Sequence, residues 1–146
     1  MFAVTTETIA IASDHAGFPM KEVLKKELAD GGYTVIDLGT SDEGAVDYSD
    51  YGKILAESVA SGRASRGVAV CGSGVGISIA VNRISGVRGA LVHDRLGMEL
   101  ARQHNDANVM VLGGRVTGIE VAKDCLRTFL DTEFFKKVKN SEVYSM

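Results

Sequence analysis

The chain has 146 residues, of which 45% are hydrophobic and 24% charged, with a single proline. These proportions exclude a disordered polypeptide and predict one globular domain over residues 1–146, large enough to bury a core without metal ions or disulfides. The formal net charge of -3 argues against a broad surface for nucleic acid or an anionic membrane. Any anionic ligand must therefore be held by local groups.

The N-terminal region and the cysteines indicate neither secretion nor a metal centre. The apolar stretch at residues 9–12 is too short for a signal peptide or a membrane span, so a cytoplasmic protein is expected. Cys71 and Cys125 stand far apart without a CxxC motif, which predicts neither a zinc site nor a disulfide framework. We therefore expect no metal and no cofactor.

Short apolar runs alternate with amphipathic stretches along most of the chain. Five strands are predicted at residues 9–13, 34–38, 67–71, 88–92 and 108–112, with helices between them. This alternation is typical of a parallel sheet covered by helices on both faces. The predicted fold is a three-layer, doubly wound α/β sandwich with a five-stranded parallel sheet, Rossmann or flavodoxin-like.

Helical spacing of apolar residues marks five helices, the first at residues 17–30. The marking residues are Met20, Val23, Leu24 and Leu28 in the first, Tyr51, Leu55 and Val59 in the second, Ile77, Ile79 and Ala80 in the third, Leu96, Leu100 and Ala101 in the fourth, and Ile119, Ala122, Cys125, Leu126, Phe129 and Leu130 in the fifth. Cys125 is thereby predicted to be an inert thiol on a core face. Residues 134–146 lose the alternation and predict a C-terminal arm or an extra helix.

Ligands bind open parallel sheets at the carboxyl ends of the strands, where the winding reverses. Polar or glycine-rich residues follow four of the predicted strands, at 13–15, 71–76, 93–94 and 113–115. The run Cys-Gly-Ser-Gly-Val-Gly at 71–76 opens a helix, so its amides can converge on an anionic oxygen or stabilise a thiolate at Cys71. A plain strand-to-helix turn with a packed cysteine is the alternative.

Known glycine signatures do not match this loop. The third glycine of the loop does not stand at the spacing that the dinucleotide fingerprint requires, and no Gly-Lys-Ser/Thr follows for a P-loop. Ser78 would lie inside the helix rather than on the strained turn of a nucleophile elbow. Dinucleotide, ATP and serine-hydrolase functions are therefore excluded.

The other polar residues have structural as well as functional interpretations. Asp14 and His15 are either a capping pair or hydrogen-bonding groups beside the thiol. His104 and Asn105 fit a helix C-terminus equally well. Arg115, which follows two glycines, is either a surface charge or an anchor for an anion.

Four motifs together resemble the type B ribose-5-phosphate isomerases, a family that includes allose-6-phosphate and galactose-6-phosphate isomerases. They are SDHAGF at 13–18, VDYSDY at 46–51, CGSGVGISIAVN at 71–82 and HNDANV at 104–109. The resemblance covers residues 9–134. It implies a metal-independent aldose–ketose isomerase that binds a small sugar phosphate and works as a homodimer or tetramer, with its sites at the dimer interface.

The resemblance also implies roles for individual residues. Cys71 matches the base that moves a proton between C1 and C2 of the open-chain sugar, and His104 matches the residue that opens the sugar ring. Ser73 stands where threonine is usual and keeps the hydroxyl. The loop residues that match those holding the enediolate are Gly72, Ser73, Gly74, Val75 and Gly76.

Further matches concern binding of the substrate. Asn105 matches a residue that contacts the substrate next to the ring-opening histidine. Asp14 and His15 match the pair at the sugar end or the phosphate. Arg115 matches a phosphate-binding arginine, and Tyr48 matches an aromatic residue near the ligand.

The C-terminal region departs from the family pattern. After Thr-Glu-Phe at 132–134, many members continue with Gly-Gly-Arg-His and a further arginine, whereas this chain continues Phe-Lys-Lys-Val-Lys. Lysine neutralises phosphate as a point charge but lacks the bidentate fork of arginine. Lys137 is the predicted replacement.

The leading hypothesis is interconversion of ribose 5-phosphate and ribulose 5-phosphate through a cis-enediolate, which needs a base and preorganised donors for the developing charge. A hexose-6-phosphate isomerase acting on allose or galactose 6-phosphate is the nearest alternative. A non-enzymatic sugar-phosphate-binding module and a cysteine-dependent hydrolase also remain open.

Overall fold

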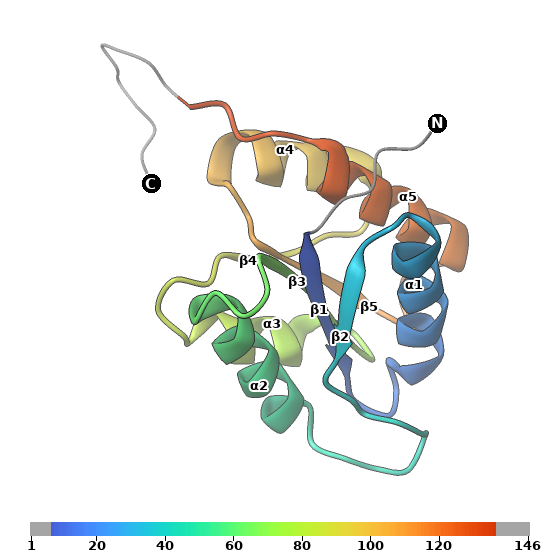
Figure 1. Ribbon diagram of the computed structural model, residues 1–146. Coiled ribbons are helices and arrows are strands. Elements are labelled where there is room, and N and C mark those ends of the chain that lie inside the picture. The colour runs from blue at the N-terminus through green and yellow to red at the C-terminus, as the bar shows by residue number, and fades with distance from the viewer. Residues whose placement is uncertain (1–6, 137–146) are drawn as a thin grey trace.

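The computed structural model describes residues 7–136, in which strands and helices alternate (Figure 1). The elements are β1 (Thr8–Ser13), α1 (Phe18–Asp30), β2 (Thr34–Asp37), α2 (Tyr48–Ala60), β3 (Arg66–Cys71), α3 (Val75–Asn82), β4 (Gly89–Leu91), α4 (Arg95–Asn105), β5 (Val109–Gly113) and α5 (Ile119–Asp131). Each strand boundary lies within one residue of the predicted one. The five-stranded, three-layer α/β architecture is confirmed.

All strand pairs are parallel, and the order across the sheet is β2-β1-β3-β5-β4. This order differs from the flavodoxin order 2-1-3-4-5 by exchange of the last two strands. The connection from β1 leads outward to β2, and the chain then crosses back past β1 to form β3. The winding therefore reverses between β1 and β3.

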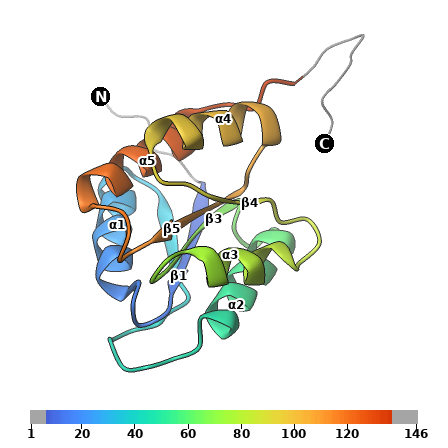
Figure 2. The same ribbon diagram turned by 180° about the vertical axis from the view of Figure 1, so that it is seen from behind.

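Two apolar layers separate the sheet from its helices (Figures 1 and 2). Alternate strand residues face opposite sides, so Ile9 and Ile11 pack under α1, α4 and α5, whereas Ala10 and Ala12 pack under α2 and α3. Burial on both faces explains why the strands appear in the sequence as continuous apolar runs. Cys125 is fully buried in the first layer, as predicted.

The fourth helix forms where predicted but buries a different face. Leu96 and Leu100 are 55% and 44% exposed, whereas Met98 and Arg102 are buried. Arg102 tolerates burial because its guanidinium donates to the carbonyls of Thr132 and Ala107. The residues that marked this helix in the sequence therefore lie partly on its exposed side, since helical spacing locates an apolar stripe without saying what covers it.

Two apolar residues that marked other helices are also exposed, Ile79 in α3 at 53% and Ile119 in α5 at 38%. Both lie on helix faces that no other element of the described chain covers. In α1 the predicted face of Met20, Leu24 and Leu28 is buried.

Helix α1 also buries a lysine that the apolar pattern does not mark. Lys21 is fully buried, and its Nζ lies 2.8 Å from both carboxylate oxygens of Asp37 at the end of β2. Burial alone would raise the pKa of Asp37, but hydrogen bonds from Lys21 and Lys25 outweigh it and hold that pKa below its usual value. Asp37 Oδ1 also accepts from the Gly39 N–H, and the Gly39 carbonyl accepts from Ser13 N–H. The ion pair therefore braces the turn beside the end of β1.

Residues 132–136 follow α5 as an irregular segment along α4 (Figures 1 and 2). The rest of the predicted arm, 137–146, lies outside the described residues. Among the helices of residues 7–136, none combines the length and apolar character needed to cross a membrane.

Candidate active site

Three loops meet at the carboxyl ends of β1, β3 and β5, beside the point where the winding reverses. The Asp14 N–H donates to the Val70 carbonyl at 3.2 Å, and the Arg115 N–H donates to the Gly72 carbonyl at 2.9 Å. The sheet thereby brings together predicted site residues that are about a hundred positions apart in the sequence. These three loops form the candidate active site.

Cys71 is the last residue of β3 and is 4% exposed. Its Sγ accepts a hydrogen bond from the Gly74 N–H at 3.2 Å. Gly74 has a φ of 84°, and a Cβ there would lie 2.5 Å from Leu91 Cδ1, so this turn requires glycine. The sulfur therefore lies beside the Gly74 amide and the first turn of α3.

The remainder of the 72–76 loop lies next to an aromatic ring and is partly exposed to solvent. Ser73 is exposed, and its Oγ accepts from the Val75 N–H at 3.1 Å. The ring of Tyr48 occupies the space of a side chain at Gly76, where a Cβ would lie 2.7 Å from the ring. Tyr48 is 43% exposed, so one side of its ring stays available to a ligand next to the loop.

Asp14 and His15, which follow β1, each hold a loop through a hydrogen bond. Asp14 is 6% exposed, and its Oδ1 accepts from the Gly17 N–H at 2.9 Å, so the capping interpretation describes part of its role. His15 Nδ1 accepts from the Val46 N–H at 3.1 Å. A neutral imidazole that accepts at Nδ1 carries its proton at Nε2, so His15 can donate to an anionic ligand.

Arg115 places a cation against the glycine loop. Its Nη1 lies 3.6 Å from the position that a Cβ on Gly72 would occupy, and the residue is exposed. A guanidinium in this place can bind an oxyanion with two parallel hydrogen bonds.

His104 and Asn105 lie elsewhere. They end α4, which is followed directly by β5, so they stand at the amino edge of the sheet, where β1 begins (Figure 1). Cys71 lies at the opposite, carboxyl edge, so one chain does not bring the thiol and His104 together. Lys137 lies outside the described residues.

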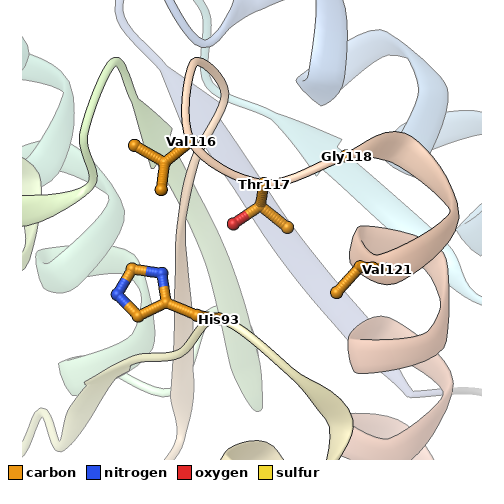
Figure 3. Close-up of a pocket in the computed structure, with 5 residues that line it drawn as sticks. All are labelled: His93, Val116, Thr117, Gly118 and Val121. Atoms are coloured by element: carbon orange, nitrogen blue, oxygen red, sulfur yellow. The ribbon is translucent and has the colours of Figure 1, made fainter.

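A pocket of about 330 Å³ opens where β4 and β5 end (Figure 3). It is lined by His93, Val116, Thr117, Gly118 and Val121, none of which the sequence placed in the site. In the sequence, His93 was noted only because it follows a predicted strand. Within residues 7–136, no three His, Cys, Asp or Glu side chains gather closely enough to hold a metal ion.

Two contributors to the site carried no signal in the sequence. Val46 acts through its backbone N–H, which nearly every residue type supplies. The brace between Lys21 and Asp37 joins residues whose proximity depends on the packing of α1 against β2. In the sequence, the brace shows itself only as a charged residue, Lys21, next to an apolar helix face.

Comparison with known proteins gives one consistent family. A model of the ribose/galactose isomerase family matches residues 9–146. The putative sugar phosphate isomerase YwlF of Bacillus subtilis is 40% identical over 127 residues, which cover 86% of this chain and 85% of that protein. Ribose-5-phosphate isomerase B of Escherichia coli is 40% identical over 126 residues, with the same coverage of 86% and 85%.

A third relative and a solved structure agree. The galactose-6-phosphate isomerase subunit LacB of Clostridium acetobutylicum is 40% identical over 135 residues, covering 92% of this chain and 78% of that protein. The crystal structure of a ribose 5-phosphate isomerase from Thermotoga maritima superimposes with a TM-score of 0.89 at 46% identity, covering 91% of this chain and 92% of that one. The chain therefore belongs to the ribose/galactose isomerase family of sugar phosphate isomerases.

Proposed function

We propose that this protein interconverts ribose 5-phosphate and ribulose 5-phosphate through a cis-enediolate. The observation that carries the proposal is the buried Cys71 thiol at the carboxyl end of β3, with an amide aimed at its sulfur and the Arg115 guanidinium over the same loop. The names of the relatives support the class of reaction.

Cys71 is the proposed base. Its thiolate takes the proton from C2 of the open-chain aldose, the electron pair of that bond forms the C1–C2 double bond, and the carbonyl oxygen becomes anionic. Transfer of the O2 proton to O1 and return of the proton from Cys71 to C1 then give the ketose and restore the thiolate. The amides of 72–76 and the Ser73 hydroxyl stabilise the enediolate oxygens, and one such donor is typically worth about 2.7 to 4 kcal/mol of barrier.

The phosphate requires local positive charge, because the chain as a whole is negative. Arg115 and the Nε2–H of His15 supply donors at the carboxyl edge of the sheet, and Lys137 is proposed to add a second cation beside Arg115. Asp14 and Tyr48 flank the sugar. Asp14 has a carboxylate held close to the end of β3, in a position to accept from sugar hydroxyls.

A second copy of the chain is proposed to complete the site. Since Cys71 and His104 stand at opposite edges of one sheet, a site that holds both needs the end of α4 from another protomer beside the 72–76 loop. Leu96, Leu100 and His104 share one face of α4 at spacings of four, and the first two are exposed leucines. Val75 and Ile79, exposed on α3 next to the loop, offer a matching apolar surface.

This arrangement lets His104 of the partner subunit open the sugar ring by moving a proton between the anomeric hydroxyl and the ring oxygen. Asn105 of the partner subunit would bind the same end of the substrate. Mixing Cys71→Ser protein with His104→Asn protein tests the arrangement, because a mixed dimer has one site with both residues intact. Recovery of activity on mixing is expected, and its absence would contradict the shared site.

The reaction itself is tested with a panel of four-, five- and six-carbon aldose phosphates, assayed for ketose formation. The highest kcat/KM is expected for ribose 5-phosphate. A preference for a hexose 6-phosphate would favour the alternative to which the LacB relative points, at the same 40% identity. Turnover that survives a thiol reagent would exclude both the isomerase mechanism and a cysteine-dependent hydrolase, and no turnover with any sugar phosphate would favour a binding module.

A further inference from the structure

The segment that follows α5 is attached to the C-terminal end of α4 by two hydrogen bonds. Arg102 Nε donates to the Thr132 carbonyl at 3.0 Å, and the Phe135 N–H donates to the Gln103 carbonyl at 2.9 Å. Gln103 belongs to the last turn of α4, whose carbonyls have no partner within the helix, so the segment completes the helix end. Its path along α4 is visible in Figures 1 and 2.

This attachment brings the ring of Phe135 against the imidazole of His104. The ring centroids lie 5.9 Å apart and the planes are perpendicular, at 90°. Both values fall in the range of favourable edge-to-face aromatic pairs. Phe135 is 56% exposed, so burial in the core does not explain where its ring lies.

His104 has little else to hold its ring. It is exposed, and within residues 7–136 neither of its ring nitrogens takes part in a hydrogen bond. The ring contact therefore limits rotation of the imidazole while both nitrogens stay free to exchange protons with a ligand. Ring opening needs both properties. One imidazole must exchange protons with the anomeric hydroxyl and the ring oxygen, and its orientation must be fixed while it does so.

We propose that Phe135 is a positioning residue that orients the imidazole of His104 for ring opening. The inference rests on the proposed function in assigning ring opening to His104, but the contact between the two rings is independent of that assignment. Phe135 lies in the C-terminal segment, at the point where the resemblance given above departs from the family pattern.

Nuclear magnetic resonance of the histidine side chains tests the contact directly. The chain has three histidines, so the His104 signals are identified by their loss in His104→Asn. Phe135→Ala should remove the ring-current shift and the through-space contacts of the His104 protons while leaving the His15 and His93 signals in place. Phe134→Ala is the matched control, since it removes a neighbouring ring that makes no ring contact with His104. Unchanged His104 signals in Phe135→Ala would overturn the proposal whatever the activity.

Kinetics test the consequence. Phe135→Ala should lower kcat on ribose 5-phosphate by about two- to tenfold, the range that corresponds to one aromatic pair, with KM little changed. Erythrose 4-phosphate, which cannot cyclise, should be converted at the parent rate, and Phe135→Tyr should restore conversion of the cyclic substrate. Equal losses on both substrates, or no loss on the cyclic one, would overturn the positioning role. An inactive parent protein would instead overturn the proposed function, and the two failures are told apart by assaying the parent first.

Discussion

The thiol of Cys71 and the imidazole of His104 lie at opposite edges of the same parallel sheet, one at the end of β3 and the other just before β5 begins. The other predicted residues within the described chain divide between these two places. Asp14, His15, Tyr48 and Arg115 gather with Cys71, whereas Asn105 stays with His104. Each edge thus presents half of the proposed chemistry.

Replacing Cys71 by serine should abolish turnover, because an alcohol in that position stays protonated near neutral pH. A loss of about 10²- to 10⁴-fold in kcat is expected from removing a general base, with substrate binding kept within several-fold. The measurement is steady-state kinetics together with calorimetric binding of the substrate. Cys125→Ser is the control and should remain active, since that thiol lies in the core. Substantial isomerase activity in Cys71→Ser would assign the base elsewhere.

Replacing His104 by asparagine should separate ring opening from proton transfer. Sugar phosphates that cyclise present few open chains to Cys71, so ribose 5-phosphate should lose far more rate than erythrose 4-phosphate. The ratio of the two kcat/KM values measures the effect. Equal losses on the two substrates would place His104 in another step.

Removing the guanidinium of Arg115 should weaken phosphate binding. Arg115→Ala should raise KM by about 10- to 100-fold, as expected for a hydrogen bond to a charged group, and should make phosphorylated sugars no better than free ones. Arg63→Ala removes an exposed arginine in the turn before β3, at the amino edge of the sheet, and should leave KM unchanged. An unaltered KM in Arg115→Ala would assign the phosphate to His15 and the C-terminal lysines.

The buried ion pair between Lys21 and Asp37 should contribute to stability. Lys21→Met should lower the free energy of unfolding by about 3 kcal/mol, the lower end for breaking a buried pair, because Lys25 still neutralises Asp37. Urea denaturation measures this, and Lys26→Met, on the exposed side of α1, should change it by less than about 1 kcal/mol. Because the pKa of Asp37 is lowered in the folded state, the contribution of the pair should be lost as the pH falls below about 3.8.

Cys125 should make the protein less stable in alkali. Burial, with help from Asp124 and Asp94, raises the pKa of this thiol from 9.0 to about 11. Between those values the unfolded chain has lost the thiol proton and the folded chain has kept it, so stability should fall by about 1.4 kcal/mol per pH unit. Comparing the free energy of unfolding of the parent and Cys125→Ala from pH 8 to pH 11 isolates this contribution. Parallel curves for the two proteins would contradict the raised pKa.

The sheet was predictable because its signals are local. Residues 9–12 and 67–71 are apolar throughout, which is what a strand covered on both faces requires, and each predicted boundary lies within one residue of the observed one. The glycines of 72–76 likewise marked a strand-to-helix loop at Cys71, and the turn at Gly74 needs a residue without a side chain. Family motifs then supplied hypotheses for the chemistry at each loop.

The sequence alone established the order and type of the elements, the loop at Cys71 and the negative net charge. Tertiary structure alone decided which face of α4 is buried, that Lys21 pairs with Asp37, that Phe135 contacts His104 and that Cys71 and His104 stand apart in one chain. Strand and helix patterns arise from residues a few positions apart, which the sequence displays directly. Contacts such as these join residues from different elements, and they exist only once the packing of helices against the sheet has set the distances between them.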